Sequence, residues 1–403
     1  MNACGIVVEY NPFHNGHKYH VSKSREQSGA DCMIAVMSGH FLQRGEPAII
    51  DKWHRTKAAL QSGVDLVLEL PYVYAVQHSD YFSKGAVLSL SALGIDSLCF
   101  GSENGKIPPF MKAYDDLKEN KTSYEVKIRQ ALDLGHSYPD AARIANEAIG
   151  ISTASFDFSA PNNILGFSYI KQILTYDESI KPLTIKRQES EFHDEHLSGR
   201  MASATSIRKE ILKEDGLSEH ARQALPQETI DQLTHYRERA DLWHNWNLYF
   251  PLLHYKLSVS SLKELHAIHG VDEGLEYRLK QAIKTSVSFF DFMEKVKTKR
   301  YTWTRIQRVC THILTNFTKV EADLYLDQNT VPYVRVLGMN QTGQDYLGQR
   351  KKKMDVPLIT QPQKANHLML DIEERASAAY YNPLPNDRRN NHYHREFGAP
   401  VRI

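Results

Sequence analysis

The sequence has few cysteines and no long apolar run, the features that are typical of secreted, zinc-binding and membrane-spanning proteins. It has only four cysteines in 403 residues, Cys4, Cys32, Cys99 and Cys310, and no two of them form a C-x-x-C pair. This scatter argues against a disulfide framework and against a thiolate metal site, and it predicts buried free thiols. The most apolar run, residues 64–70, is far shorter than the roughly 20 residues of a membrane-spanning helix.

Neither sign of charge dominates, because 49 lysines and arginines balance 48 aspartates and glutamates to a net charge of +1. A nucleic-acid surface therefore requires local clustering of basic residues. The first residues, Met1 to Gly5, lead directly into an apolar segment and lack the basic start of a secretory signal. We therefore expect a cytoplasmic protein without a membrane anchor, and the length is enough for two domains of about 100–200 residues each.

The first hundred residues alternate short apolar runs with amphipathic segments. Strands are expected at residues 5–10, 32–37, 64–70 and 95–100, and helices at residues 16–27, 51–62 and 79–93. Strands that are apolar on both faces are typical of a parallel sheet covered by helices on both sides. This pattern predicts a doubly wound α/β domain, in which ligands bind at the carboxyl ends of the strands.

Beyond this region the pattern becomes mostly helical. We predict an α/β domain at residues 1–215 and a mostly helical domain at residues 216–403. The expected elements are a helix at 163–175, a strand at 182–187, a helix from 205, helices at 227–236, 262–269 and 276–294, and a strand at 331–338. From Asn382 onward the tail, which is rich in proline and asparagine and includes His392 and His394, is expected to lie on the surface.

A histidine pair directly follows the first expected strand, in the run N-P-F-H-N-G-H at residues 11–17. Two imidazoles three residues apart at a helix start, His14 and His17, face the same way, and Gly16 removes the side chain that would keep a phosphate from the backbone. The N–H groups of a helix start add an anion site. The pair is suited to donate hydrogen bonds to the phosphates of a nucleotide, and the alternative is two incidental histidines in a loop.

A second cluster of small polar residues, S-A-T-S-I-R at residues 203–208, opens another expected helix. In most proteins such residues only cap the helix. Together with H-x-G-H, however, the cluster resembles the I-S-S-T-x-I-R motif of the α/β nucleotidyltransferase superfamily, with Ala204 in place of the second serine. The resemblance implies a Rossmann-like (HUP) catalytic domain and a cradle for the β- and γ-phosphates of ATP. The residues that would form this cradle are Ser203, Thr205, Ser206 and Arg208.

Longer stretches are similar to the bacterial tRNA(Met) cytidine acetate ligase family. They lie at residues 5–20, 37–48, 100–103, 161–166 and 185–187. The resemblance implies ATP-dependent activation of acetate to acetyl-adenylate, with release of pyrophosphate. It further implies transfer of the acetyl group to the exocyclic amine of the wobble cytidine in elongator tRNA(Met), which forms N4-acetylcytidine.

The same resemblance implies an ATP site, with His14 and His17 as the catalytic pair. The residues that it assigns to ATP binding are Val7, Val8, Glu9, Tyr10, Asn11, Pro12, Phe13, His14, Asn15, Gly16, His17, Lys18, Tyr19, His20, Gly101, Asn162 and Arg187. Gly101 ends an expected strand, where a missing side chain lets adenine or ribose approach. The alternatives are a plain turn for Gly101, a helix cap for Asn162 and a solvated charge for Arg187, although the planar fork of an arginine suits a phosphate.

Residues 38–48 follow the second expected strand and carry several polar side chains between two glycines. This composition is consistent with a lid that excludes water from a hydrolysable adenylate, and also with a mobile surface loop. The run H-D-E-H at residues 193–196, from His193 to His196, lacks a third metal ligand at a recognisable spacing, which favours a solvated loop. ATP is expected as its magnesium complex, without a dedicated protein site for the metal.

A basic segment with interleaved aromatic residues is the expected tRNA surface of the second half. Its expected tRNA-binding residues are Lys297, Lys299, Arg300, Trp303, Arg305 and Arg308. Basic groups bind phosphates, and aromatic rings stack on unpaired bases. For Trp303 the alternative is a core residue that anchors a helix. Residues 350–353, R-K-K-K, are either a second RNA contact or a solvated face.

Two other functions fit parts of this pattern. The first is a nucleotidyltransferase that adenylylates a phosphorylated small molecule, because H-x-G-H serves both reactions. The second is a non-catalytic RNA-binding protein with a vestigial nucleotide pocket. The expected ligands are ATP, acetate as its co-substrate and elongator tRNA(Met), and the sequence indicates no protein partner.

Overall fold

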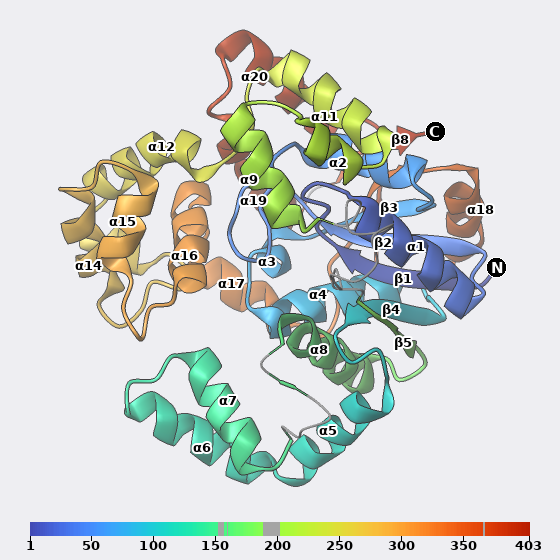
Figure 1. Ribbon diagram of the computed structural model, residues 1–403, viewed down its shortest axis with the longest axis horizontal. Helices are drawn as coiled ribbons and strands as arrows, with labels where there is room; N and C mark the ends of the chain where they lie inside the picture. Colours follow the sequence, from blue (N-terminus) through green and yellow to red (C-terminus); the bar gives the residue numbers. More distant parts are fainter. Residues whose placement is uncertain (152–156, 159, 188–201, 366) are drawn as a thin grey trace.

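The computed structural model describes residues 1–151, 157–158, 160–187, 202–365 and 367–403 (Figure 1). Its centre is an eight-stranded sheet with the strand order β5-β4-β1-β2-β3-β6-β7, in which β8 also pairs with β6. The strands are β1 (Ala3–Val8), β2 (Cys32–Ser38), β3 (Leu66–Leu70), β4 (Ser97–Ser102), β5 (Lys181–Lys186), β6 (Val334–Met339), β7 (Leu358–Ile359) and β8 (Val401–Arg402).

Strands β1 to β5 pair in parallel, so their carboxyl ends meet at one edge of the sheet. β6 is antiparallel to β3 and carries β7 and β8 as parallel neighbours. The sheet is therefore dominated by parallel strands and draws on both halves of the chain. This architecture confirms the predicted doubly wound α/β fold with a mostly helical region after it.

Helices cover both faces of the sheet because successive strand residues point to opposite sides. On one face, Val21 of α1 and Trp53 of α2 share a buried cluster with Ile6 of β1. On the other face, Leu90 of α4 packs in a second cluster with Ile34 of β2. The helices of this region are α1 (Asn15–Ser28), α2 (Lys52–Gln61), α3 (Tyr72–Ala75), α4 (Ser79–Ala92), α5 (Pro108–Glu119), α6 (Lys121–Asp133), α7 (Tyr138–Ala148) and α8 (Pro161–Tyr176).

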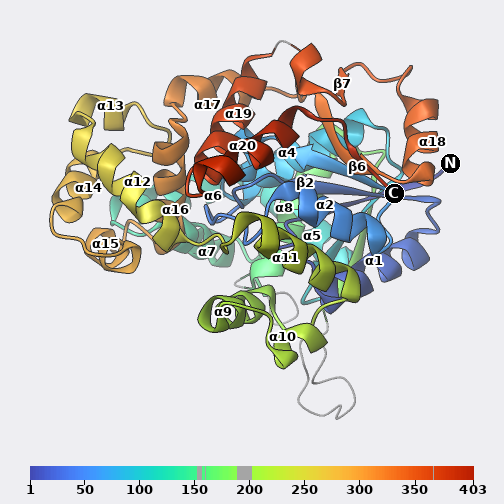
Figure 2. The same cartoon turned by 90° about the horizontal axis from the view of Figure 1, so that it is seen from above.

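The second half adds two groups of helices. The segment after α10 meets the start of α1, where the carbonyl oxygen of Ala224 accepts the backbone N–H of Asn15 at 3.0 Å. α12 to α17 form a layer at the left of Figure 1, and Figure 2 shows the same helices from above. These helices are α9 (Ala204–Glu214), α10 (Glu219–Gln223), α11 (Gln227–Ala240), α12 (Trp246–Val259), α13 (Leu262–His266), α14 (Leu275–Ile283), α15 (Phe289–Val296), α16 (Trp303–Thr315) and α17 (Lys319–Tyr325). The one helix expected at residues 276–294 is two helices, because Ser288 caps a new start at α15.

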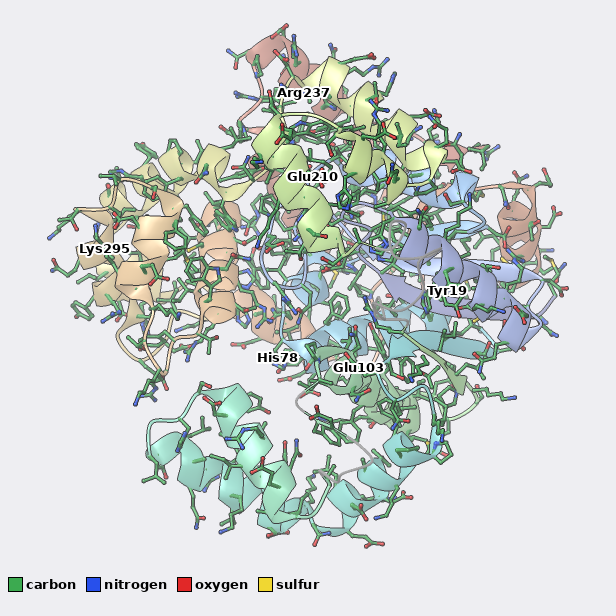
Figure 3. The ribbon with its side chains drawn as sticks, in the orientation of Figure 1. Tyr19, His78, Glu103, Glu210, Arg237 and Lys295 are labelled. Atoms are coloured by element: carbon green, nitrogen blue, oxygen red, sulfur yellow. The ribbon has the colours of Figure 1, made fainter. Side chains whose placement is uncertain are left out.

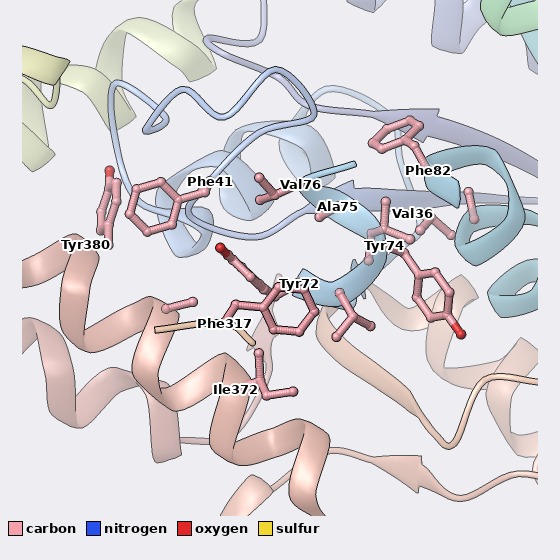
Figure 4. Close-up of a cluster of buried hydrophobic side chains, with 14 of the residues drawn as sticks. Val36, Phe41, Tyr72, Tyr74, Ala75, Val76, Phe82, Phe317, Ile372 and Tyr380 are labelled. Atoms are coloured by element: carbon pink, nitrogen blue, oxygen red, sulfur yellow. The ribbon is translucent and has the colours of Figure 1, made fainter. Parts of the chain in front are cut away.

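The helical layer is joined to the sheet by a continuous buried cluster (Figure 4). Tyr72 and Val76, which follow β3, pack there with Phe317 and with Ile372 of α19. The hydroxyl of Tyr72 is 3.0 Å from Nδ1 of His312 on α16. The layer is therefore fixed beside the carboxyl edge of the sheet. The last helices are α18 (Gln341–Arg350), η1 (Pro362–Lys364), α19 (Leu368–Tyr381), α20 (Asn386–His394) and η2 (Arg395–Phe397).

The expected surface position of the C-terminal tail is wrong in part, because His394 is exposed but His392 and Glu396 are buried. Glu396, which is 3% exposed, accepts a hydrogen bond from Nε2 of His40 at 2.9 Å and pairs with Lys52 at 2.7 Å. His392 is also buried, and β8 joins the sheet beside β6. The composition of the tail concealed this position, because a carboxylate that is buried against cations looks like a solvated one in the sequence.

The four cysteines are buried and unpaired, as predicted. Burial is the main cause that raises the thiol pKa of Cys4, Cys32 and Cys99. Among the helices of the described ranges, none is both long and apolar enough to cross a membrane.

Candidate active site

The H-x-G-H turn lies at the carboxyl end of β1 and opens α1. His14 caps this helix: its Nδ1 accepts the backbone N–H of Gly16 at 3.1 Å, and its own backbone N–H donates to Nδ1 of His17 at 3.2 Å. The two rings stack with their centroids 3.8 Å apart. A Cβ atom on Gly16 would lie 2.9 Å from Cε1 of His14, so glycine is needed between the histidines. The turn thus holds the two imidazoles side by side.

The histidines of this turn are electrically neutral near pH 7. Removal from water, and then the nearby Arg187 guanidinium, lowers the pKa of His14 to about 4. The same two causes lower the pKa of His20 to about 4, and burial with these neighbours holds the pKa of His17 well below its usual range. Because Nδ1 of His14 and of His17 each accept a hydrogen bond, the ring proton sits on Nε2. The pair therefore offers two uncharged N–H donors.

Gly101, Asn162 and Arg187, far apart in the sequence, meet at the carboxyl ends of β4 and β5. Nη1 of Arg187 donates to Oδ1 of Asn162 at 2.8 Å, and a Cβ atom on Gly101 would lie 3.2 Å from Cγ of Arg187. Glu103, labelled in Figure 3, accepts the backbone N–H groups of Asn162 at 3.1 Å and of Asn163 at 2.7 Å. Sequence reasoning did not single out Glu103, although it lies in one of the stretches similar to the family. This carboxylate fixes the amide that holds Arg187.

The second polar cluster lies at the start of α9 and is tied to the H-x-G-H turn. Ser203 is the N-cap and accepts the backbone N–H of Ser206 at 3.1 Å. Arg208 donates to the carbonyl oxygen of Asn11 at 2.8 Å and to the carboxylate of Glu46 at 2.9 Å. Ser203 therefore caps α9, as the alternative interpretation expects, and Arg208 ties this helix to the H-x-G-H turn. Its hydroxyl residues, Ser203, Thr205 and Ser206, are exposed.

The other residues of the predicted ATP site divide into a buried and an accessible set. The buried residues are Val8, Tyr10, Asn11, Pro12 and Phe13. The partly or fully exposed residues are Val7, Glu9, Asn15, Lys18, Tyr19 and His20. The ring of Tyr10 lies 4.5 Å from that of Phe13 and 5.0 Å from that of His17. The buried aromatic rings therefore pack against the histidine turn. Lys18 pairs with Glu228 of α11 at 3.2 Å.

A buried arginine that sequence reasoning missed joins the ends of β1 and β2. Arg55 of α2 is 1% exposed and donates to the carbonyl oxygens of Glu9 at 2.7 Å and of Ser38 at 3.0 Å. It also donates to the carbonyl oxygens of Gly39 and Ile50, and burial lowers its pKa. No local signal identifies it, because an arginine on an amphipathic helix is usually solvated.

Residues 38–48 are largely buried beside α16, so the alternative of a mobile surface loop is wrong. Gln307 donates to the carbonyl oxygen of Arg44 at 2.9 Å, and Nε of Arg308 donates to that of Gln43 at 2.8 Å. The segment is thereby fixed to the helical layer. Residues 38–48 therefore lie beside the end of β1, and hydrogen bonds from α16 hold them there.

The predicted tRNA-binding residues lie in the segment that connects α15 to α16 and on α16, at the left of Figure 1. Lys297 and Lys299 are exposed. Arg300 forms an ion pair with Glu273, and Arg305 lies 3.6 Å from the same carboxylate. One acidic residue therefore neutralises part of this surface and leaves the two lysines as its accessible cations.

Arg308 and Trp303 lie closer to the interior than the other residues of this segment. Removal from water, and then the nearby Arg44, lowers the pKa of Arg308 to about 10. The ring of Trp303 lies 5.6 Å from that of Phe290, and its Nε1 donates to Gln307 at 3.2 Å. The R-K-K-K run at residues 350–353 follows α18 on the opposite side of the molecule (Figure 1).

The H-D-E-H run at residues 193–196 lies outside the described residues. In the ranges that the structure does describe, no three His, Cys, Asp or Glu side chains are grouped so that they could hold a metal ion.

A Rossmann-like sheet with an H-x-G-H turn at the carboxyl end of its first strand defines a nucleotidyltransferase-type nucleotide site. In agreement with this class, residues 1–395 match the HIGH Nucleotidyl Transferase family. The chain is 51% identical over 403 residues to the tRNA(Met) cytidine acetate ligase of Oceanobacillus iheyensis, covering 100% of both chains. It is 46% identical over 406 residues to that of Bacillus subtilis, covering 100% of this chain and 97% of the relative.

A solved structure gives the same result. The crystal structure of Thermotoga maritima TmcAL bound with alpha-thio ATP matches with a TM-score of 0.90 and 31% sequence identity, covering 100% of both chains. The protein belongs to the tRNA(Met) cytidine acetate ligase family, and the resemblance predicted from the motifs is confirmed.

Proposed function

We propose that this protein activates acetate with ATP and transfers the acetyl group to the wobble cytidine of elongator tRNA(Met). The observation that carries the proposal is the pair of neutral imidazoles at the start of α1, beside the Arg187 guanidinium. Membership of the tRNA(Met) cytidine acetate ligase family supports the reaction and its RNA substrate. The alpha-thio ATP bound to the Thermotoga maritima relative supports ATP as the activating nucleotide.

In the first step an acetate oxygen attacks the α-phosphorus of ATP. A new P–O bond forms while the bond to the β-phosphate oxygen breaks, which yields acetyl-adenylate and pyrophosphate. The Nε2–H groups of His14 and His17 donate to phosphate oxygens on which negative charge develops, and Arg187 adds a positive charge beside them. Because both rings are neutral donors, they stabilise this charge without gaining or losing a proton.

The remaining residues of the site bind and orient the nucleotide. Ser203, Thr205 and Ser206 present hydroxyl groups to the β- and γ-phosphates, and Arg208 holds their helix against the H-x-G-H turn. Gly101 leaves room for the nucleoside at the end of β4. ATP enters as its magnesium complex, and its phosphates hold the ion, because the site residues are N–H and O–H donors rather than grouped carboxylates.

In the second step the exocyclic amine of cytidine attacks the carbonyl carbon of acetyl-adenylate. A C–N bond forms, the C–O bond to AMP breaks, and the amine loses a proton. Lys297 and Lys299 bind tRNA phosphates, since both are exposed and no carboxylate of the described residues lies within ion-pair distance of either. The free thiols are consistent with a reducing cytoplasm as the place of this reaction.

Exchange of labelled pyrophosphate into ATP, with a panel of carboxylates and with or without tRNA, tests the first step. We expect exchange that depends on acetate, and transfer of one oxygen from labelled acetate to AMP once tRNA is added. A stable adenylylated small molecule would instead indicate a true nucleotidyltransferase. Tight tRNA binding without exchange on any carboxylate would indicate a non-catalytic RNA-binding protein.

A further inference from the structure

A basic pocket of about 510 Å³ opens between α2, α11 and α20, outside the nucleotide site. Its cations come from three regions of the chain that are distant in the sequence. They are Lys57 on α2, Arg239 on α11, Arg388 on α20 and Arg395 just beyond α20. None of these residues belongs to the H-x-G-H turn, to the Arg187 cluster or to the segment around Lys297.

The positive charge of this pocket is only partly neutralised. Lys57 and Arg239 are exposed, and within the described ranges no carboxylate lies within ion-pair distance of either. Arg388 lies 3.4 Å from Asp241 at the edge. Asp51 is the acid that lines the pocket, and it is already engaged by His54, whose Nδ1 lies 2.7 Å away.

Two contacts hold Arg395 in place, and the charges of the neighbouring cations act on a histidine of the pocket wall. The guanidinium of Arg395 lies 4.3 Å above the ring of Trp53, and its Nη1 donates to the carbonyl oxygen of Ala399 at 2.6 Å. Partial burial, together with Arg239, His54 and Lys57, lowers the pKa of His235 on the wall of the pocket. Cations fixed around one cavity form a site for a multiply charged anion.

The pocket and the nucleotide site flank the same stretch of chain. The backbone N–H of Ile49 donates to Oδ1 of Asn11, in the H-x-G-H turn, at 2.7 Å, and Asp51 of the pocket follows two residues later. One short segment of chain therefore connects the H-x-G-H turn to the pocket. The indole of Trp53 is 5% exposed and covered by Arg395, so a free base cannot stack on it.

We propose that this pocket binds a backbone phosphate of the RNA substrate. The inference rests on the proposed function in that it takes the substrate to be a tRNA. Lysine and arginine bind phosphates through charge and through paired N–H donors, and each contact releases counterions from the RNA. The pocket thus adds a second anchor, on helices other than those that flank Lys297 and Lys299.

The test compares the double variant Lys57→Gln/Arg239→Gln with the matched control Lys112→Gln/Lys121→Gln, which removes two exposed lysines on α5 and α6. We expect the pocket variant to bind tRNA about tenfold more weakly, and its salt slope to fall by roughly 0.7–0.9 log unit per lost contact. The control should bind like the wild type. Pyrophosphate exchange without tRNA should be unchanged in the pocket variant, because it does not involve the pocket.

Three outcomes overturn the proposal. In the first, the pocket variant binds tRNA like the wild type. In the second, the control loses as much affinity, which indicates non-specific charge. In the third, affinity for inorganic pyrophosphate falls while tRNA binding persists, which indicates a small-anion site. Failure of the proposed function is distinct, since the wild-type protein itself would then form no acetylated tRNA.

Discussion

The backbone N–H of His14 donates to Nδ1 of His17 across 3.2 Å, and this bond determines how the pair acts. It points the lone pair of His17 at the main chain and leaves the ring proton on Nε2. The N–H of Gly16 does the same for His14 at 3.1 Å. The spacing of the motif therefore sets the tautomers of its own histidines, and it makes them hydrogen-bond donors.

Replacement of His14 by asparagine separates catalysis from helix capping. Asparagine is a good N-cap, so α1 should keep its start while the Nε2–H donor is lost. We expect adenylate formation, measured as ATP–pyrophosphate exchange, to fall about 10²–10³-fold, the scale for one preorganised donor. His17→Ala should show a similar loss. The melting temperature of His14→Asn checks that the fold is intact. Exchange at the wild-type rate in both variants would show that His14 and His17 do not act in adenylate formation.

The neutral His14 should make folding stability depend on pH. The folded pKa of His14 is about 4 and its ordinary value is 6.5, so between these values the unfolded chain binds more protons. The contribution of His14 to the free energy of unfolding is therefore highest above pH 6.5, and it falls as the pH drops from 6.5 toward 4. The loss between pH 7 and pH 5 should be about 2 kcal/mol smaller in His14→Asn than in the wild type.

Urea unfolding of both proteins at the two pH values measures this difference. Each protein serves as its own reference, so other titrating groups cancel in the comparison. Equal losses in the two proteins would mean that His14 titrates in the folded state as it does in the unfolded chain.

Arg187→Gln should raise the pKa of His14. Burial is the larger cause of its low pKa and the Arg187 charge is the smaller, so the pKa should rise and stay below 6.5. Affinity for ATP should fall about tenfold, since a hydrogen bond to a charged group contributes about 1.5–3 kcal/mol. NMR titration of the histidines and nucleotide binding measure the two effects. An unchanged titration of His14 would place Arg187 away from the turn in solution.

Glu396→Ala should destabilise the protein by about 3–5 kcal/mol, because it leaves Lys52 and Arg335 buried with one fewer negative charge. Both cations contact this carboxylate, at 2.7 Å and 3.5 Å. The control is Glu147→Ala, whose ion pair with Arg143 is about half exposed and should contribute less than about 1 kcal/mol. Equal effects of the two substitutions in chemical denaturation would contradict the buried position of the tail.

Trp303→Ala should lower the melting temperature, because the indole packs on Phe290 and donates to Gln307. Trp303→Phe keeps most of the packing and should recover most of the stability. If Trp303 also stacks on a base, tRNA affinity should fall in the alanine variant by about 1–3 kcal/mol with little change in salt slope. A normal melting temperature with weakened tRNA binding would make it a base-stacking residue alone.

Local patterns carried the prediction of the first strands, the H-x-G-H turn and the start of α9. A run that is apolar on both faces is recognised within one strand, and two histidines three residues apart are recognised within one helical turn. The neutral state of the histidines was not among these predictions, because it depends on burial and on the distant Arg187. The strands, the turn and the helix start could be predicted because the interactions that produce them are short-range.

The sequence by itself determined the parallel sheet, the histidine turn and the family. Only the tertiary structure decided that Arg187 meets Asn162, that Glu103 fixes that amide, and that α16 holds residues 38–48. It also decided that Glu396 is buried against Lys52. These contacts join segments separated by tens to hundreds of residues, and whether a charged side chain is solvated or paired depends on what the fold places beside it, which no local spacing encodes.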